Sequence, residues 1–415
     1  MKNVIFNLLY FLICGFFFAC AEDTPVSVTN NKTSKSVNSE SQKSKMNSYP
    51  STKKALVKLK VDVYLENSGS MDGYIAGKEF KNVIYGYLSD VAIAKNHNIV
   101  EEMNLFYINK DVLPQTSDLN KFINNLDVEA FKHLGGKRNS TDIAELLDTV
   151  LNRTKSSKLS ILISDFIFSP GKGNNAEDYL ENQKNTIKMR IDERITKDKN
   201  FAVCVYKFES QFEGKYFDKN DKPSVIKEKR PFYVWLLGNK FMIKKLKKEI
   251  PDSRFGDKLK NMLIFEPMNQ NIDYKLSNKS NYMMLNGNKE LTNFIKDGEG
   301  KYSFFVKVDV SKLLQGKSYF EDKSSYVHNK TIDIDRIKYS DGVLQLKLVA
   351  NLPNPAEYSI KFESSLPQWV NESNDNVGER ALMGKTYGFK YLIDGVYEAF
   401  TYKSKMYSEI KISVK

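Results

Sequence analysis

The feature that most constrains the fold is a regular alternation of β-type and helical runs between residues 56 and 250. The β-type runs are short and rich in β-branched and other apolar residues, whereas apolar residues recur at helical spacing in the helical runs. Strands are predicted at Val57–Leu65, Met103–Ile108, Leu159–Ile163, Phe201–Phe208 and Phe232–Leu237, and helices at Phe80–Ala94, Asp142–Leu151, Glu177–Lys197 and 240–249. Strands that alternate with helices over this length predict an α/β fold with a doubly wound, mostly parallel sheet.

Polar residues in three loops between these elements predict a metal site. In doubly wound folds, ligands bind at the carboxyl ends of the strands, where the connecting loops gather. Hydroxyl and carboxylate oxygens from separate loops suit a hard divalent cation, Mg²⁺ or Mn²⁺. The candidate ligands are Glu66, Ser68, Ser70, Thr141 and Asp165.

Together these loops resemble the metal-ion-dependent adhesion site of the von Willebrand factor A domain family. The family shows Asp-x-Ser-x-Ser after the first strand, a Thr in a second loop and an Asp in a third. Ser68 and Ser70 match the serines, Thr141 the threonine and Asp165 the third-loop acid. The resemblance covers residues 56–250 and implies a VWA/Rossmann-like domain. It also implies cation-assisted binding of a protein partner, whose carboxylate completes the metal shell.

Two features depart from the family pattern. Glu66 stands in place of the leading Asp and is one methylene longer. This substitution keeps the charge and leaves three outcomes open: intact metal binding, weaker binding, or preference for another ion. Residues 137–140 form an insertion, Lys-Arg-Asn-Ser, that adds positive charge beside the site. That charge would attract an acidic partner or replace part of the cation's role.

Each site residue also has an ordinary structural explanation. Ser68 and Ser70 are common turn residues, and an acid at position 142 complements a helix dipole. Asp165 resembles a capping acid. Their joint occurrence in three linked loops favours a site over three separate coincidences.

Other chemistries find less support in the sequence. The histidines, at positions 97, 133 and 328, lack zinc-ligand spacing. No His lies near Ser68 or Ser70 to act as a base for a nucleophilic serine. Cys204, inside an apolar strand, is expected to be a core residue. The sequence therefore predicts that the protein is not an enzyme.

The positive net charge identifies no partner. Lys and Arg exceed Asp and Glu by 63 − 51 = 12, but acids lie between the basic residues along most of the chain. The densest basic run, Lys240–Lys248, is typical of the solvated face of a helix. No nucleic-acid-binding module accompanies it, so no nucleic acid partner is predicted.

The first twenty residues resemble a bacterial lipoprotein signal. Lys2 precedes an apolar run, Val4–Ala19, that is too short for a membrane-spanning helix and ends directly before Cys20. Removal of residues 1–19 would leave Cys20 as the lipidation site and membrane anchor. The acids after it loosely resemble the export tether of Bacteroidetes lipoproteins. Residues 20–55 are poor in apolar side chains and are predicted to be a flexible tether.

The predicted location is therefore the bacterial cell envelope, as an outer membrane lipoprotein on the periplasmic face or the cell surface. An ordinary cleaved signal or an uncleaved anchor is the alternative.

Beyond residue 250 the helical pattern fades. Residues 251–280 are predicted to be a connector, and residues 281–415 a β-rich, sandwich-like domain. Its strands are predicted at 304–310, 332–337, 343–349, 358–362 and 409–414. Trp369 and the aromatic cluster of residues 387–402 are expected in the core of that sandwich, with a ligand platform as the alternative.

The predicted function is divalent-cation-dependent protein–protein binding or adhesion by a lipid-anchored envelope protein. The partner is an unidentified protein that presents a carboxylate. A metal-independent structural scaffold of an envelope assembly is the alternative function. A metal-assisted hydrolase using the same carboxylates is the third.

Overall fold

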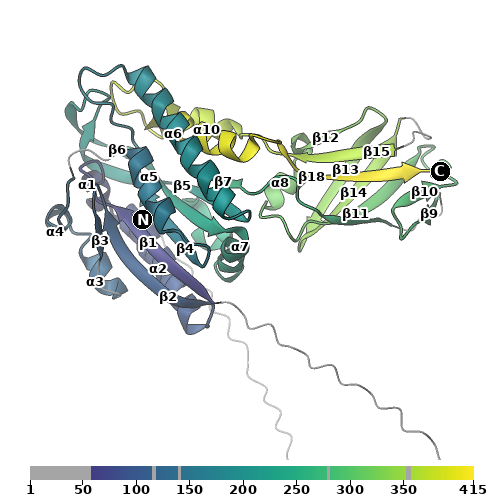
Figure 1. Cartoon of the computed structure of the whole chain (residues 1–415), viewed down its shortest axis with the longest axis horizontal. Coiled ribbons are helices and arrows are strands. Elements are labelled where there is room, and N and C mark those ends of the chain that lie inside the picture. Colours follow the sequence, from purple (N-terminus) through teal and green to yellow (C-terminus); the bar gives the residue numbers. More distant parts are fainter. Residues whose placement is uncertain (1–57, 115–117, 139–141, 278–280, 352–356) are drawn as a thin grey trace, which may run out of the picture. The chain divides into compact units, whose positions relative to one another are not determined.

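The computed structural model describes residues 58–114, 118–138, 142–277, 281–351 and 357–415 (Figure 1). The predicted signal peptide, the predicted tether, Cys20 and Thr141 lie outside the described residues. Within the described ranges, the largest sheet consists of β1 (Leu59–Glu66), β2 (Val100–Ile108), β3 (Val112–Pro114), β4 (Lys158–Ser164), β5 (Phe201–Phe217), β6 (Pro223–Asn239) and β7 (Asn261–Phe265). The order across this sheet is β3-β2-β1-β4-β6-β5-β7.

This sheet is mixed, which corrects the prediction of a mostly parallel one. β1 pairs in parallel with β2 and with β4. β6 runs antiparallel to both β4 and β5, β7 runs antiparallel to β5, and β3 runs antiparallel to β2. The short turn between β5 and β6 joins adjacent strands, and such a turn permits only antiparallel pairing. The α/β class is confirmed, whereas parallel winding extends no further than β2, β1 and β4.

Helices cover both faces of the sheet because successive strand residues point to opposite sides. Val61 and Val63 of β1 share a core cluster with α2, whereas Tyr64 shares the other cluster with α5 and α6. The helices of this region are α1 (Asp72–Ile75), α2 (Lys78–Asn96), α3 (Leu119–Asn124), α4 (Val128–Lys132), α5 (Ile143–Arg153), α6 (Ala176–Lys197) and α7 (Lys240–Glu249). The helices predicted from residues 80, 142, 177 and 240 onward are confirmed as α2, α5, α6 and α7.

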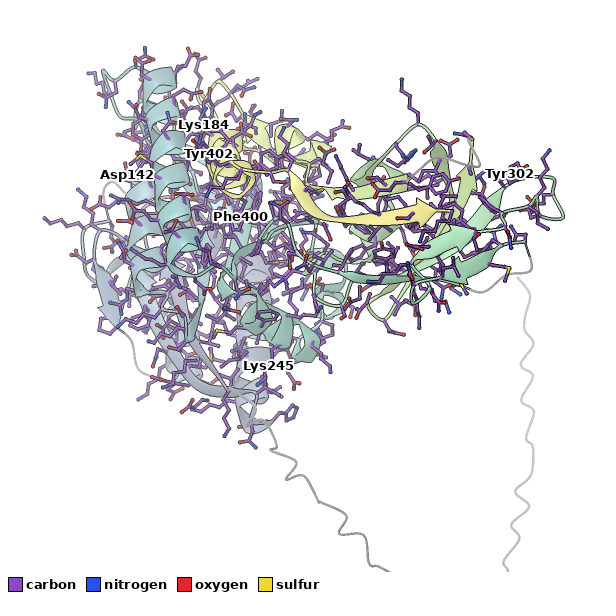
Figure 2. All side chains as sticks on the ribbon, turned by 45° about the vertical axis from the view of Figure 1, so that its right-hand side comes forward. Asp142, Lys184, Lys245, Tyr302, Phe400 and Tyr402 are labelled. Atoms are coloured by element: carbon purple, nitrogen blue, oxygen red, sulfur yellow. The ribbon has the colours of Figure 1, made fainter. Side chains whose placement is uncertain are left out.

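The last helix, α10 (Phe389–Thr401), packs against α6 and completes the layer on that face (Figures 1 and 2). Gly395 permits close approach, because a Cβ there would lie 2.6 Å from the backbone oxygen of Lys184. Phe400, near the end of α10, stacks with Phe201 and Phe265 of the large sheet. The aromatic cluster expected in a β-sandwich core therefore belongs instead to the α/β core.

Two further sheets lie in the carboxyl-terminal part, so its β-rich character is confirmed. Among the described residues, one has the strand order β12-β15-β18-β10-β9 and the other β13-β14-β11-β8. Their apolar side chains form a single core cluster. The strands are β8 (Asp273–Leu276), β9 (Met283–Leu285), β10 (Glu290–Thr292), β11 (Ser303–Asp309), β12 (Tyr326–His328), β13 (Ile332–Ser340), β14 (Val343–Ala350), β15 (Glu357–Glu363) and β18 (Met406–Val414).

Short elements connect these layers. They are the 3₁₀ helices η1 (Asp252–Lys258) and η2 (Lys323–Ser325), the helices α8 (Lys317–Glu321) and α9 (Gln368–Glu372), and the strands β16 (Asn374–Asp375) and β17 (Thr386–Tyr387). In the part of the chain that the structure describes, no helix is long and apolar enough to cross a membrane.

Candidate metal centre

The described candidate ligands meet at the carboxyl ends of β1 and β4. These strands pair in parallel, with Leu65 opposite Ile163, so both end at the same edge of the sheet. Glu66 is the last residue of β1, and Asp165 directly follows β4. Ser68 and Ser70 lie in the loop after β1, where their hydroxyl oxygens are 2.9 Å apart. The structure therefore brings together four of the five predicted ligands, and Thr141 lies outside the described residues.

Glu66 is buried and tied back to the neighbouring strand. Its side chain is 2% exposed, and its Oε2 accepts a hydrogen bond from the Ser164 hydroxyl. Ser164 Oγ in turn accepts one from the backbone N–H of Phe166, at 2.8 Å. Burial and the nearby Asp165 carboxylate raise the pKa of Glu66 to about 8, although the hydroxyls of Ser164 and Ser68 oppose the shift. A carboxyl group in this environment is protonated near neutral pH unless a cation replaces the proton.

Asp165 is still more enclosed, with 1% of its surface exposed. Its Oδ1 accepts a hydrogen bond from the Ile167 N–H at 3.3 Å, whereas its buried Oδ2 accepts none from any described residue. Burial raises the pKa of Asp165, opposed by the Ile167 N–H, the Arg230 guanidinium and the Ser70 hydroxyl. An unsatisfied buried carboxylate oxygen is costly, so Oδ2 marks a position where a cationic ligand would be stabilising.

Arg230 supplies positive charge behind this pair. It is 1% exposed and lies over the Tyr216 ring, with its Cζ 4.6 Å from the centroid. Its guanidinium donates to the Lys385 carbonyl at 3.2 Å and to Glu228 at 3.4 Å. Because Arg230 is also paired with Glu228, it offsets only part of the charge of an ionised Asp165.

The chain turns sharply after Asp165. Phe166 has a φ of 52°, in the left-handed region that a bulky residue rarely adopts. Its ring is fully buried and packs 4.8 Å from the ring of Trp235. This packing offsets the backbone strain, which is of order 1–2 kcal/mol for such a conformation. The strained turn directs the following residues, including Ile167 and Ser169, along the rim of the site.

Arg138, from the predicted basic insertion, holds the loop after β1. It donates through Nε to the Asn67 side-chain oxygen at 2.7 Å and through Nη2 to the Ser68 carbonyl at 3.1 Å. It also forms a hydrogen-bonded ion pair with Asp72. Because Asp72 neutralises its charge, Arg138 acts as a clamp on the loop that carries the serines.

The site opens into a pocket of about 550 Å³. Glu66, Ser68 and Ser70 line its floor, and Asp165 lies behind them, outside the lining. Part of the wall comes from the outer half of β5 and from Asp221 at the tip of the β5–β6 hairpin. A small ligand group can therefore reach the serine hydroxyls and Glu66 directly.

The oxygen donors fit a hard divalent cation with few protein ligands. The described residues contain no group of three or more His, Cys, Asp and Glu side chains placed to hold a metal ion. The site instead combines two carboxylates with two serine hydroxyls, and the unsatisfied Asp165 Oδ2 provides a free acceptor. Glu66, Ser68, Ser70 and Asp165 are the described residues that would hold such an ion.

Several contributors to the site were not predicted. Ser164 follows the buried run of β4, and its contact with Glu66 depends on the register of two strands distant in sequence. Arg230 lies in a charged stretch that gave no sign of burial. The hairpin wall did leave a signal, because apolar Phe212 and Tyr216 alternate with charged residues before the turn at residues 218–222.

Comparison of the chain with protein-family models, curated proteins and solved structures found no match. The fold and the site together define an α/β protein with an oxygen-rich, acidic site at the ends of two neighbouring parallel strands.

Proposed function

We propose that this chain binds a protein partner through a divalent cation, Mg²⁺ or Mn²⁺, held at the ends of β1 and β4. The observation that carries the proposal is the buried pair of Glu66 and Asp165, in which Asp165 Oδ2 has no hydrogen-bond partner within the described ranges. Two adjacent buried carboxylates require a counter-charge or a proton. The proposed role is binding without catalysis.

Different residues of the site have different roles in this proposal. Ser68 and Ser70 present hydroxyl oxygens to the pocket, and the Arg138 clamp fixes the loop that carries them. Asp165 supplies the buried negative charge. When bound, the cation would offer an open coordination position to a carboxylate of the partner. The proposal places this activity at the cell envelope, with membrane attachment through a lipid on Cys20.

A metal-independent scaffold is the second candidate, and a specific contact favours it. Protonated Glu66 would be satisfied by its hydrogen bond with Ser164, and Arg138 already stabilises the loop without an ion. In that case the buried pair would carry one proton, and the surface would bind its partner without a cation.

Calorimetric titration of Mg²⁺ and Mn²⁺ into the purified protein at pH 8.5 separates the two candidates. Saturable binding of one ion per chain supports the cation-dependent function. Absence of binding by both ions at this pH, where Glu66 is mostly ionised, contradicts it and favours the scaffold.

The affinity for Mn²⁺ is expected to rise with pH. Below its pKa of about 8, Glu66 carries a proton that the ion must displace. Simple competition predicts an increase of about thirtyfold between pH 6.5 and pH 9, most of it complete by pH 8.5. Titrations across this range measure the effect, and Glu66→Gln should flatten the profile. A native protein with pH-independent affinity would show that Glu66 takes no part.

A further inference from the structure

We propose that the β5–β6 hairpin makes this site selective for acidic peptide segments that carry two carboxylates. One carboxylate completes the cation site, so the inference rests on the proposed function, and the second pairs with Lys215 on the hairpin wall.

The hairpin extends beyond the edge of the sheet where the site lies. β4 ends at Ser164, which pairs with Tyr233 of β6. The outer halves of the two strands, residues 209–217 and 223–231, pair with each other beyond that point. The hairpin therefore overhangs the ends of β1 and β4 and closes one side of the pocket.

Direct contacts hold the hairpin against the loop and helices after β1. The Tyr74 hydroxyl donates to the Pro231 carbonyl at 2.6 Å, and the Gln211 N–H donates to Glu79 at 2.7 Å. A Cβ on Gly73 would lie 2.3 Å from the Phe212 ring, which shows how closely the two segments pack. The wall is therefore a fixed part of the site.

Strand alternation determines which hairpin residues face the pocket. Phe212 and Tyr216 are buried, at 1% and 2% exposure. The odd-numbered residues between and beyond them, Glu213, Lys215 and Phe217, line the pocket. The Phe217 ring also borders the loop after β1 that carries Ser68 and Ser70, since a Cβ at Gly69 would lie 3.6 Å from the ring.

Most charges around the pocket are already paired. Glu213 pairs with Lys227 at 2.9 Å, Lys132 with Glu129 at 3.0 Å, and Arg138 with Asp72.

Lys215 forms no ion pair with any described residue, so its ammonium is the pocket cation left for a ligand. Asp221, at the hairpin tip, is a pocket acid without an ion pair among the described residues, and it disfavours a longer run of acids. The charges thus favour a ligand that has one carboxylate besides the one at the cation, placed to pair with Lys215 on the wall that also carries Phe217.

Selection from a displayed library of random short peptides tests this inference. The purified full chain is immobilised with Mn²⁺ at pH 8.5, and bound peptides are released with EDTA. Peptides from the native protein are expected to share two acidic residues. Peptides with a single shared acid, or no shared acid, would overturn the inference.

Lys215→Glu is the decisive variant, and Lys229→Glu is its matched control. Lys229 is exposed on the same hairpin and does not line the pocket. We expect Lys215→Glu to weaken binding of a selected two-acid peptide by about three- to tenfold, with Lys229→Glu close to native. Equal binding by the two variants would overturn the inference.

The Mn²⁺ titration separates the two levels of failure. If both variants bind Mn²⁺ like the native protein and also bind the selected peptide equally well, the inference fails and the cation site stands. If the native protein binds no ion, the proposed function fails and the inference fails with it.

Discussion

Replacement of Asp165 by Asn is expected to lower the affinity for Mn²⁺ at least about a hundredfold, the largest effect of a single change at the site. Asp165 contributes a buried negative charge and a buried carboxylate oxygen, Oδ2, that has no hydrogen-bond partner among the described residues. Asn keeps the shape and the acceptor for the Ile167 N–H but removes the charge. Titration calorimetry at pH 8.5 measures the loss, and circular dichroism checks that the fold is retained.

Asp192→Asn is the control for the loss of Mn²⁺ affinity expected in Asp165→Asn. Asp192 is an exposed acid on α6, so the variant has the same change in charge outside the site. It is expected to bind Mn²⁺ like the native protein. Native affinity in Asp165→Asn would contradict a metal site built on this carboxylate.

Gly73→Ala is expected to destabilise the protein by about 1–3 kcal/mol, as overpacking of a tight core contact usually does. The new methyl group would overlap the Phe212 ring, which is 1% exposed and also touches Tyr74 edge-on at 5.0 Å. Relief requires the hairpin to move away from the loop after β1. Chemical denaturation measures the change in the free energy of unfolding.

Gly86→Ala is the matched control on the adjacent helix. Gly86 lies in the middle of α2, and a Cβ there would meet no atom within 4 Å. Ala is favoured over Gly in a helix interior, so this variant is expected to be about 0.5–1 kcal/mol more stable than the native protein. If Gly73→Ala were also stabilising, the hairpin would not pack against the loop as described.

Local patterns predicted β1, α2, β2, α5 and β4, because each carries its own signal, whereas the short elements α1, β3, α3 and α4 were not predicted. The helical spacing in α2 and α5 and the apolar runs of β1 and β4 are visible without knowledge of their neighbours. The strand ends then placed Glu66 and Asp165 at one edge, since parallel neighbours end together.

The direction of β6 could not be obtained in the same way. Alternating burial is the same in parallel and antiparallel strands, and the insertion of β6 between β4 and β5 depends on non-local pairing. The sequence also predicted two short strands where the structure has two of 17 residues each. In the outer half of β5, apolar Phe212 and Tyr216 alternate with charged residues, so part of the signal was present in the sequence.

The contacts that set the electrostatics of the site were beyond sequence reasoning. Arg138 was expected to offer free positive charge, but its partner Asp72 is 66 positions away. Burial of Arg230 depends on the Lys385 carbonyl from a distant segment. Such pairings follow from the finished fold rather than from local composition.

The packing of α10 on α6 has a consequence for the growing chain. The apolar face of α6, which includes Leu180, Ile187 and Ile191, packs partly against α10, which is synthesised long after α6. Until α10 is made, the part of α6 that it covers lacks its partner, and exposed apolar surfaces promote aggregation of incomplete chains. Completion of the α/β core therefore requires a helix that follows the β-rich sheets in the chain, and a chain that stops before residue 389 would leave the core incomplete.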